Sequence, residues 1–335
     1  MIRTRLCDLL GIEHPIIQAA IWPATSPELV AAVSNAGGMG SIGAILATAD
    51  DLERQIERVR AMTDRPFAVN HVVPLLNEDA FALTLEAKPA AITFALGDPG
   101  DLVDRAHAAG IPVVQQVHTV TQARQVAARG VDAIIAQGGE AGGQGLAQGP
   151  STLVLLPQVV DAVPSIPVVA AGGIADGRGL AAALVLGAQG ANVGTRFLAS
   201  EEAGVPGVWK QAILAAESED AIRFEAWRTI MPSDSEIAYD TVPRALRTPF
   251  ITDWSKHPAE VASRAAEARD EILGALRAGR IHELVPFTGQ TAGLVRDIKP
   301  AGEILRQMIA EAEQTLAAGA VLVGAQRGAT SALDA

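Results

Sequence analysis

The sequence predicts an α/β fold, a (β/α)8 TIM barrel with a mainly helical lid inserted after the eighth strand. Over the first 200 residues, short runs rich in Val, Ile and Ala alternate with longer amphipathic stretches, as strands alternate with helices. The strand runs are apolar almost throughout, which is typical of a parallel sheet covered on both faces. Eight such strand–helix units close naturally into a barrel.

The expected strands occupy residues 15–19, 38–44, 65–73, 90–96, 111–119, 131–138, 166–173 and 190–198. Helices are expected at 26–36, 50–62, 78–87, 99–110, 121–130, 151–163 and 176–187, and an eighth helix, 298–319, follows only after the lid. An open doubly wound sheet is the alternative, but its glycine-rich turn should follow the first strand. Here that turn reads AAIWPATS, and the glycine-rich turns follow strands six, seven and eight.

Three regions are expected along the chain. Residues 1–200 with 291–320 form the barrel, residues 201–290 form the lid, and residues 321–335 form a loose C-terminal tail. The lid region holds most of the aromatic side chains, and we expect them to build its core, with a minority lining a substrate pocket: Trp209, Phe224, Trp227, Tyr239 and Trp254.

Composition favours small-molecule chemistry. The 38 acidic residues outnumber the 26 Lys and Arg residues, with no basic block, which argues against a nucleic-acid or membrane partner. We find no secretory signal and no apolar run long enough to span a membrane, and the single Cys7 suits a reducing compartment, so a cytoplasmic protein is expected. His, Cys and carboxylate residues do not cluster at ligand spacing, so no metal site is expected.

The glycine-rich turns predict a place for an anion. Gly172 and Gly173 follow strand seven, and Gly194 and Thr195 stand at strand eight, where barrels commonly hold a phosphate on backbone N–H groups. The chain has no Walker motif, so the phosphate is expected to belong to a bound cofactor. The alternative is that these turns are only the tight connections that any barrel needs.

Four amides stand near strand ends: Gln18, Asn70, Gln116 and Gln137. Each amide can donate to and accept from the edge of a heterocycle, so together they indicate a ring such as a flavin, and FMN adds one terminal phosphate. Any one of them could instead tie down a loop.

Two histidines, His71 and His118, stand at strand ends and are candidates for acid–base work, with a neutral histidine bonded to a neighbouring loop as the alternative. Glu140 is the one charge in the turn GGEAGGQG, residues 138–145. We expect it to orient the loop by accepting N–H bonds, although it could act on substrate. Gln290 returns from the lid and could close over the ring.

Several blocks make the chain resemble the nitronate monooxygenase family, formerly called 2-nitropropane dioxygenases. They include HPIIQAAIWPATSPELV, DAIIAQGGEAGGQG, PVVAAGGIADGRG and GQTAGLVRDIKPAGEIL, and the likeness runs from about residue 3 to 315. FMN-dependent enoyl-acyl-carrier-protein reductases and NADH:quinone reductases share the family's shape. The resemblance implies a barrel that binds FMN non-covalently, and the expected cofactor-binding set is Gln18, Ala19, Ala20, Ile21, Asn70, Gln116, Gln137, Gly138, Gly139, Glu140, Gly142, Gly143, Ala171, Gly172, Gly173, Gly194, Thr195 and Gln290.

The implied reaction is the oxidation of alkyl nitronates with O2 to a carbonyl compound and nitrite. Many relatives read E-A-G-G-H at the turn after strand six, whereas this chain has Gln144, whose amide cannot take up a proton near neutral pH. A nitronate is already deprotonated and needs no base, so Gln144 is compatible with nitronates and less so with neutral nitroalkanes. The expected catalytic residues are His71, Gln144 and His118.

Three alternatives stay open: an NAD(P)H-dependent FMN reductase acting on a quinone or enoyl thioester, a flavin-binding protein without turnover, and a barrel that holds a phosphorylated metabolite. The expected partners are a small-molecule substrate with O2 or NAD(P)H, and a homo-oligomer is conceivable.

Overall fold

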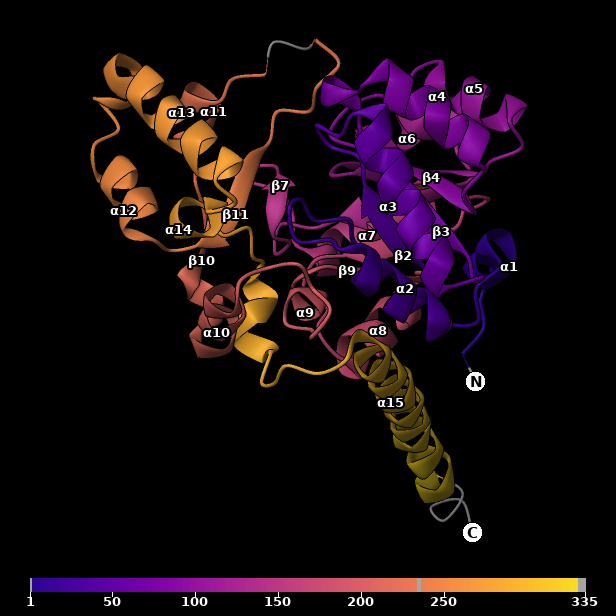
Figure 1. The fold of residues 1–335 in the computed structure, drawn as a ribbon. Helices are drawn as coiled ribbons and strands as arrows, with labels where there is room; N and C mark the ends of the chain where they lie inside the picture. The colour runs from indigo at the N-terminus through magenta and orange to yellow at the C-terminus, as the bar shows by residue number, and fades with distance from the viewer. Residues whose placement is uncertain (1, 234–235, 331–335) are drawn as a thin grey trace.

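The computed structural model describes residues 2–233 and 236–330, and its centre is a barrel of eight parallel strands (Figure 1). In the sheet the strands follow the order β1-β9-β8-β6-β5-β4-β3-β2. A parallel bridge between Ile17 and Met39 joins the two ends of this order, with the Gln18 N–H donating to the Met39 carbonyl at 2.8 Å. The predicted barrel is therefore confirmed, and its strands are β1 (Ile16–Gln18), β2 (Gly40–Gly43), β3 (Phe67–Val72), β4 (Ala91–Ala95), β5 (Val113–Val117), β6 (Ala133–Gln137), β8 (Val168–Ala171) and β9 (Gly190–Val193).

Helices cover the outside of the barrel, and polar side chains start several of them. Thr48, Asn77 and Thr119 each accept the N–H group of a residue in the first turn, which satisfies a donor that the helix itself cannot. The barrel helices are α2 (Pro27–Asn35), α3 (Ala49–Met62), α4 (Glu78–Ala87), α5 (Leu102–Ala108), α6 (Val120–Ala128), α7 (Thr152–Ala162), α8 (Gly177–Val185) and α15 (Ala301–Thr330), with the short η1 (Val73–Leu75) and α9 (Thr195–Leu198) after β3 and β9.

Alternate residues of the strands belong to two different cores. Val113 and Ile134 pack outward with the helices, whereas Val114 and Ile135 belong to the interior cluster. The first helix, α1 (Arg5–Leu10), adds Leu6, Cys7 and Leu10 to that interior cluster. Cys7 is fully buried there, so its role is packing.

The lid has a hydrophobic core of its own and is not helical throughout. Phe224, Phe250, Trp254 and Ile272 are buried together in it. The glycine-rich loop, expected as a turn, ends in the strand β7 (Gly143–Gly145), which pairs with the lid strand β11 (Val242–Leu246). The remaining lid elements are α10 (Gly207–Ala215), η2 (Ser218–Asp220), β10 (Ala221–Arg223), α11 (Trp227–Ile230), α12 (Pro249–Lys256), α13 (Val261–Arg277), α14 (Ile281–Leu284) and η3 (Gln290–Leu294).

The last helix, α15, packs on α8 and then projects from the body of the molecule (Figure 1). A Cβ on Gly177 would lie 2.3 Å from Glu311 Cβ, so the two helices approach closely where α8 begins. A loose tail was expected from residue 321, but α15 continues to Thr330. Residues 331–335 lie outside the described residues. Among the described residues, no helix has both the length and the apolar character that crossing a membrane requires.

Candidate functional site

A cavity of about 620 Å³ lies between the carboxyl ends of the barrel strands and the lid. A volume of this size is ordinary for a pocket that holds a cofactor or a small molecule. The strand ends and their loops contribute amides and glycines to its wall. The lid contributes mainly Trp227, Met231, Pro232, Ala238, Tyr239, Leu276 and Phe287, with Arg228 and Asp240.

Most of the expected site residues line this cavity. They come from separate strand ends that the barrel brings together: Ala19, Ala20, Ile21, Asn70, Gln116, Gln137, Gly142, Gly143, Gln144, Ala171, Gly172, Gly173, Gly194 and Thr195. Seven expected residues are not in its wall, and their contacts explain why: Gln18, His71, His118, Gly138, Gly139, Glu140 and Gln290.

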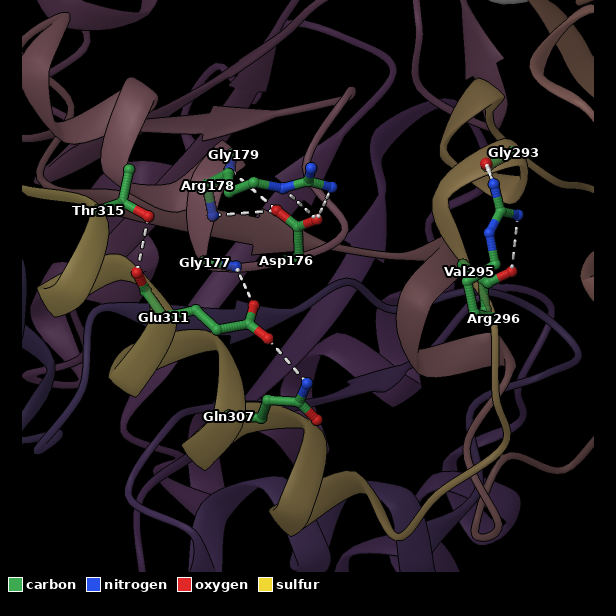
Figure 2. Close-up of polar contacts among 10 residues, drawn as sticks. All are labelled: Asp176, Gly177, Arg178, Gly179, Gly293, Val295, Arg296, Gln307, Glu311 and Thr315. Carbon is green, nitrogen blue, oxygen red and sulfur yellow. Dashed lines mark hydrogen bonds and ion pairs between the residues drawn. The ribbon is translucent and has the colours of Figure 1, made fainter. Parts of the chain in front are cut away.

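The corner expected for an anion is built from two loops. Gly172 and Gly173 adopt φ values of 94° and 76°, in the left-handed region that favours glycine, and Gly194 and Thr195 lie in the same cavity wall. The first N–H groups of α8 are already engaged, since Asp176 accepts those of Arg178 and Gly179 while Glu311 accepts that of Gly177 at 3.0 Å (Figure 2). An anion here would therefore meet the two glycine loops and the start of α9.

The glycines after β6 are explained partly by close packing within the protein. A Cβ on Gly138 would lie 2.2 Å from Thr152 Oγ1, and one on Gly142 would lie 2.5 Å from the Gly289 nitrogen. Of the four glycines Gly138, Gly139, Gly142 and Gly143, only Gly142 and Gly143 reach the cavity wall. Close approach of backbone was expected, but much of it is to protein rather than to a ligand.

Glu140 orients the loop, as expected. Its carboxylate accepts the Thr152 N–H at 2.9 Å and the Thr152 hydroxyl at 2.9 Å, which caps the start of α7. The Glu140 carbonyl accepts the N–H of Gln290 at 3.0 Å, so the segment returning from the lid is tied to the same loop.

Among the amides, Gln137 and Gln18 have different roles. Gln137 Nε2 donates to the Gln144 carbonyl at 2.7 Å and lies 3.3 Å from His118 Nε2, so it holds the glycine-rich loop while lining the cavity. Gln18 Oε1 accepts the Ser41 N–H at 3.0 Å, so it joins β1 to β2 instead of facing the cavity.

His71 points away from the cavity because side chains alternate along a strand and its neighbour Asn70 points in. His71 Nε2 lies 2.9 Å from Thr84 Oγ1 on α4, and its ring packs edge-on against Phe81 at 5.3 Å between centroids. Burial lowers the pKa of His71 to about 4, so the ring is neutral near pH 7. This is the satisfied core histidine that stood as the alternative to a catalytic role.

His118 is buried one layer behind the cavity wall. Burial, together with the positive charge of Arg223, lowers its pKa to about 4. Its ring lies edge to face with that of Tyr239, at 6.0 Å between centroids, and Tyr239 does line the cavity. His118 thus supports wall residues rather than facing the cavity.

Two arginines of the lid, Arg223 and Arg244, were not anticipated from the sequence. They oppose each other across β10 and β11, and both donate to the Gly139 carbonyl. Burial, and secondly the neighbouring Arg244, lower the pKa of Arg223 to about 10, which leaves it charged near neutral pH. The antiparallel pairing of two short lid strands brings these side chains together.

The chain matches a known protein family over most of its length. The family model described as nitronate monooxygenase matches residues 3–82 and 77–311. The chain belongs to the nitronate monooxygenase family. It is therefore an oxidoreductase of a flavoenzyme family.

Two solved structures resemble this family member over nearly its whole length. FabK from Thermotoga maritima has a TM-score of 0.85 and 36% identity, covering 98% of this chain and 99% of that one. The nitroalkane oxidase from Streptomyces ansochromogenes has a TM-score of 0.79 and 29% identity, covering 93% and 99%.

A curated relative has a different activity in its name. It is the (3aS,4S,5R,7aS)-5-hydroxy-7a-methyl-1-oxo-octahydro-1H-indene-4-carboxyl-CoA dehydrogenase of Rhodococcus jostii, 41% identical over 226 residues and 65% of this chain. The match spans 62% of that dehydrogenase's own length.

The wall of this nitronate monooxygenase family member is poor in ionisable groups. In the described part of the wall these are Arg228, Tyr239 and Asp240, and Arg228 Nε pairs with Asp240 Oδ1 at 2.7 Å. At the position of the family's histidine, Gln144 Oε1 is buried without a hydrogen-bond partner among the described residues. The described residues contain no group of three or more His, Cys, Asp or Glu able to hold a metal ion.

Proposed function

We propose that this chain is an FMN-dependent oxidoreductase that oxidises alkyl nitronates with O2 to a carbonyl compound and nitrite. The observation that carries the proposal is the cavity wall, where Gln144 stands in place of a histidine and both His71 and His118 lie outside. A substrate that arrives as an anion needs no base to remove a proton. A small organic substrate and O2 are then the partners, and a cytoplasmic, homo-oligomeric protein stays a prediction.

The donor set of the cavity suits FMN. Gly172, Gly173, Gly194 and Thr195 would hold the phosphate, since these loops bring backbone N–H groups to one corner. Gln144 Oε1 is buried without a hydrogen-bond partner among the described residues, so it would accept a hydrogen bond from the cofactor. The amides Asn70, Gln116 and Gln137 would meet the polar edge of the ring. When bound, FMN supplies the redox chemistry, accepting electrons from the substrate and passing them to the acceptor.

The chain's own contribution is to bind and orient the substrate and to exclude water. Trp227, Met231, Leu276 and Phe287 make the lid side of the cavity apolar. Water excluded from such a site cannot screen charges, so polar groups in the wall act more strongly on an anionic substrate. The Arg228–Asp240 ion pair is half to mostly exposed and belongs to the rim of this wall.

Anaerobic mixing tests the proposal directly. The purified protein should be yellow and should release FMN, identified by its mass, on denaturation. Ethylnitronate should bleach the bound flavin without oxygen, and readmitted air should restore the colour with production of nitrite. Turnover of neutral nitroethane at a rate similar to that of its nitronate would contradict the role assigned to Gln144.

A second candidate is an NAD(P)H-dependent reductase of an enoyl thioester or a quinone. The apolar lid wall favours it, because a small nitronate leaves most of that surface uncontacted. The likeness to FabK and to a carboxyl-CoA dehydrogenase supports the same direction. In the anaerobic experiment, rapid bleaching by NADH or NADPH and none by ethylnitronate would establish this candidate over the first.

A further inference from the structure

Residues 237–239 of the lid, which we call the strap, cross to the barrel and fasten to the loop after β4. Ala238 forms an antiparallel bridge with Gly97, and the Tyr239 N–H donates to the Leu96 carbonyl at 2.9 Å. The Asp98 N–H donates back to the Ile237 carbonyl at 3.2 Å. These backbone bonds fix the place of Tyr239 relative to the barrel.

The ring of Tyr239 lies on the same side of the cavity as Gln144. Its edge-to-face partner is His118, whose Nε2 lies 3.3 Å from Gln137 Nε2. Gln137 Nε2 in turn donates to the Gln144 carbonyl at 2.7 Å. Through His118 and Gln137 these contacts link a lid side chain to Gln144, the position where the family's histidine is missing.

The phenol of Tyr239 has no hydrogen-bond partner among the residues that the structure describes. Tyr239 lines the cavity, so the phenol can donate to a ligand there. Burial, with the negative charge of Asp98 as a second cause, raises its pKa, so the phenol keeps its proton and acts as a donor. The other ionisable wall residues, Arg228 and Asp240, are engaged with each other at 2.7 Å.

We propose that the phenol of Tyr239 donates a hydrogen bond to the substrate's oxyanion, the negatively charged oxygen that is conjugated with the reacting carbon. The proposal rests on the proposed function and names the residue that recognises the anion. A nitronate oxygen and the enolate-like oxygen of a thioester share this chemistry. The barrel supplies the cofactor wall, and the strap brings the substrate donor to it.

Propionate tests the assignment without turnover, because it carries the same two-oxygen anionic end as ethylnitronate on a chain of similar size. Its dissociation constant is measured by calorimetry on the FMN-loaded protein. Tyr239→Phe should weaken propionate by about tenfold or more, since a hydrogen bond to a charged group is lost. Ile237→Ala is the matched control on the strap, because that side chain is 51% exposed and outside the cavity wall, and should change the constant less than about twofold.

A second variant keeps the Tyr239 phenol but displaces the strap that positions it. A Cβ on Gly97 would lie 2.9 Å from the Ile237 carbonyl oxygen, so Gly97→Ala must displace the strap. It should weaken propionate too, and adding Tyr239→Phe should cost little more, because both changes act through one contact. Circular dichroism and the melting temperature check that each variant folds.

The assignment is overturned if Tyr239→Phe binds propionate within twofold of wild type, if Ile237→Ala weakens it equally, or if the wild type binds none. Repeating the titrations with crotonyl-CoA separates a thioester from a nitronate as the source of the oxyanion. A wild type that binds propionate through Tyr239 but leaves ethylnitronate unreacted would refute the nitronate reaction and leave the donor in place. If Tyr239→Phe oxidises ethylnitronate at full rate and binds propionate as wild type does, the donor role of Tyr239 is refuted and the nitronate reaction stands.

Discussion

Arg223 and Arg244 converge on one acceptor, the carbonyl oxygen of Gly139, which lies 3.2 Å from Arg223 Nη2 and 2.8 Å from Arg244 Nη2. Arg223 also donates to the Gly143 carbonyl at 3.1 Å. Two half-buried guanidinium groups repel each other, yet here they bridge the lid sheet and the glycine-rich loop. The loop that lines the cavity is thus held from behind by the lid.

We expect Arg244→Met to loosen this loop and to lower the free energy of unfolding by about 2 kcal/mol, because charged hydrogen bonds are lost while some Arg–Arg repulsion is relieved. Hydrogen exchange of residues 139–145 should speed up, and urea unfolding gives the stability. Arg54→Met is the control, since Arg54 is 64% exposed in a surface pair with Asp51 and should cost under about 1 kcal/mol. Equal effects of the two variants would show that Arg244 does not stabilise the glycine-rich loop.

Gly142→Ala should weaken FMN binding, because its Cβ would lie 2.5 Å from the Gly289 nitrogen and backbone must shift in the cavity wall. Overpacking of this kind typically costs about 1–3 kcal/mol. Quenching of free FMN fluorescence on titration measures the affinity. Gly274→Ala in α13 is the control: its Cβ meets nothing within 4 Å, so it should bind FMN normally and be slightly more stable. An unchanged FMN affinity for Gly142→Ala would contradict the prediction.

His71 should make stability fall with acid. Burial lowers its pKa from the usual 6.5 to about 4, so between these values the unfolded chain binds the proton more tightly than the folded one. The contribution is complete above pH 6.5 and is lost as pH falls toward 4, amounting to about 2 kcal/mol between pH 7 and pH 5. His71→Gln should flatten this part of the profile, measured by urea unfolding at several pH values. A slope equal to that of wild type would mean that other groups carry it.

Gln144→His should extend the activity toward neutral nitroalkanes, since an imidazole can take a proton near pH 7. General base catalysis is typically worth about 10²–10⁴-fold, so turnover of nitroethane should rise by at least tenfold, with ethylnitronate changed far less. Steady-state oxygen consumption with both substrates measures the ratio. Gln144→Asn is the control, because it alters size without adding a base. A rise with both variants would point to pocket shape instead.

Much of the fold and of the site was predictable from local pattern. Nearly continuous apolar runs and amphipathic helices repeat eight times, and glycines mark the turns, so the strands and the cavity-lining Gly172, Gly194 and Asn70 were found in advance. The end of α15 was not, because an alanine-rich segment near a terminus has no local signal that separates helix from tail. The lid strands β10 and β11 were missed because both are short, and because the pairing of β11 with β7 joins segments far apart in sequence.

The barrel, the order of its loops and the family could be predicted from the residues alone, because these depend on residue types at fixed local spacing. Only the tertiary structure decided which side chains face the cavity. Asn70 and His71 are neighbours, yet the pleat of β3 sends one to the mouth and the other to Thr84 on α4. Tyr239 reached the cavity only through the strap's backbone bonds to the loop after β4, a contact between segments about 140 residues apart that no local pattern encodes.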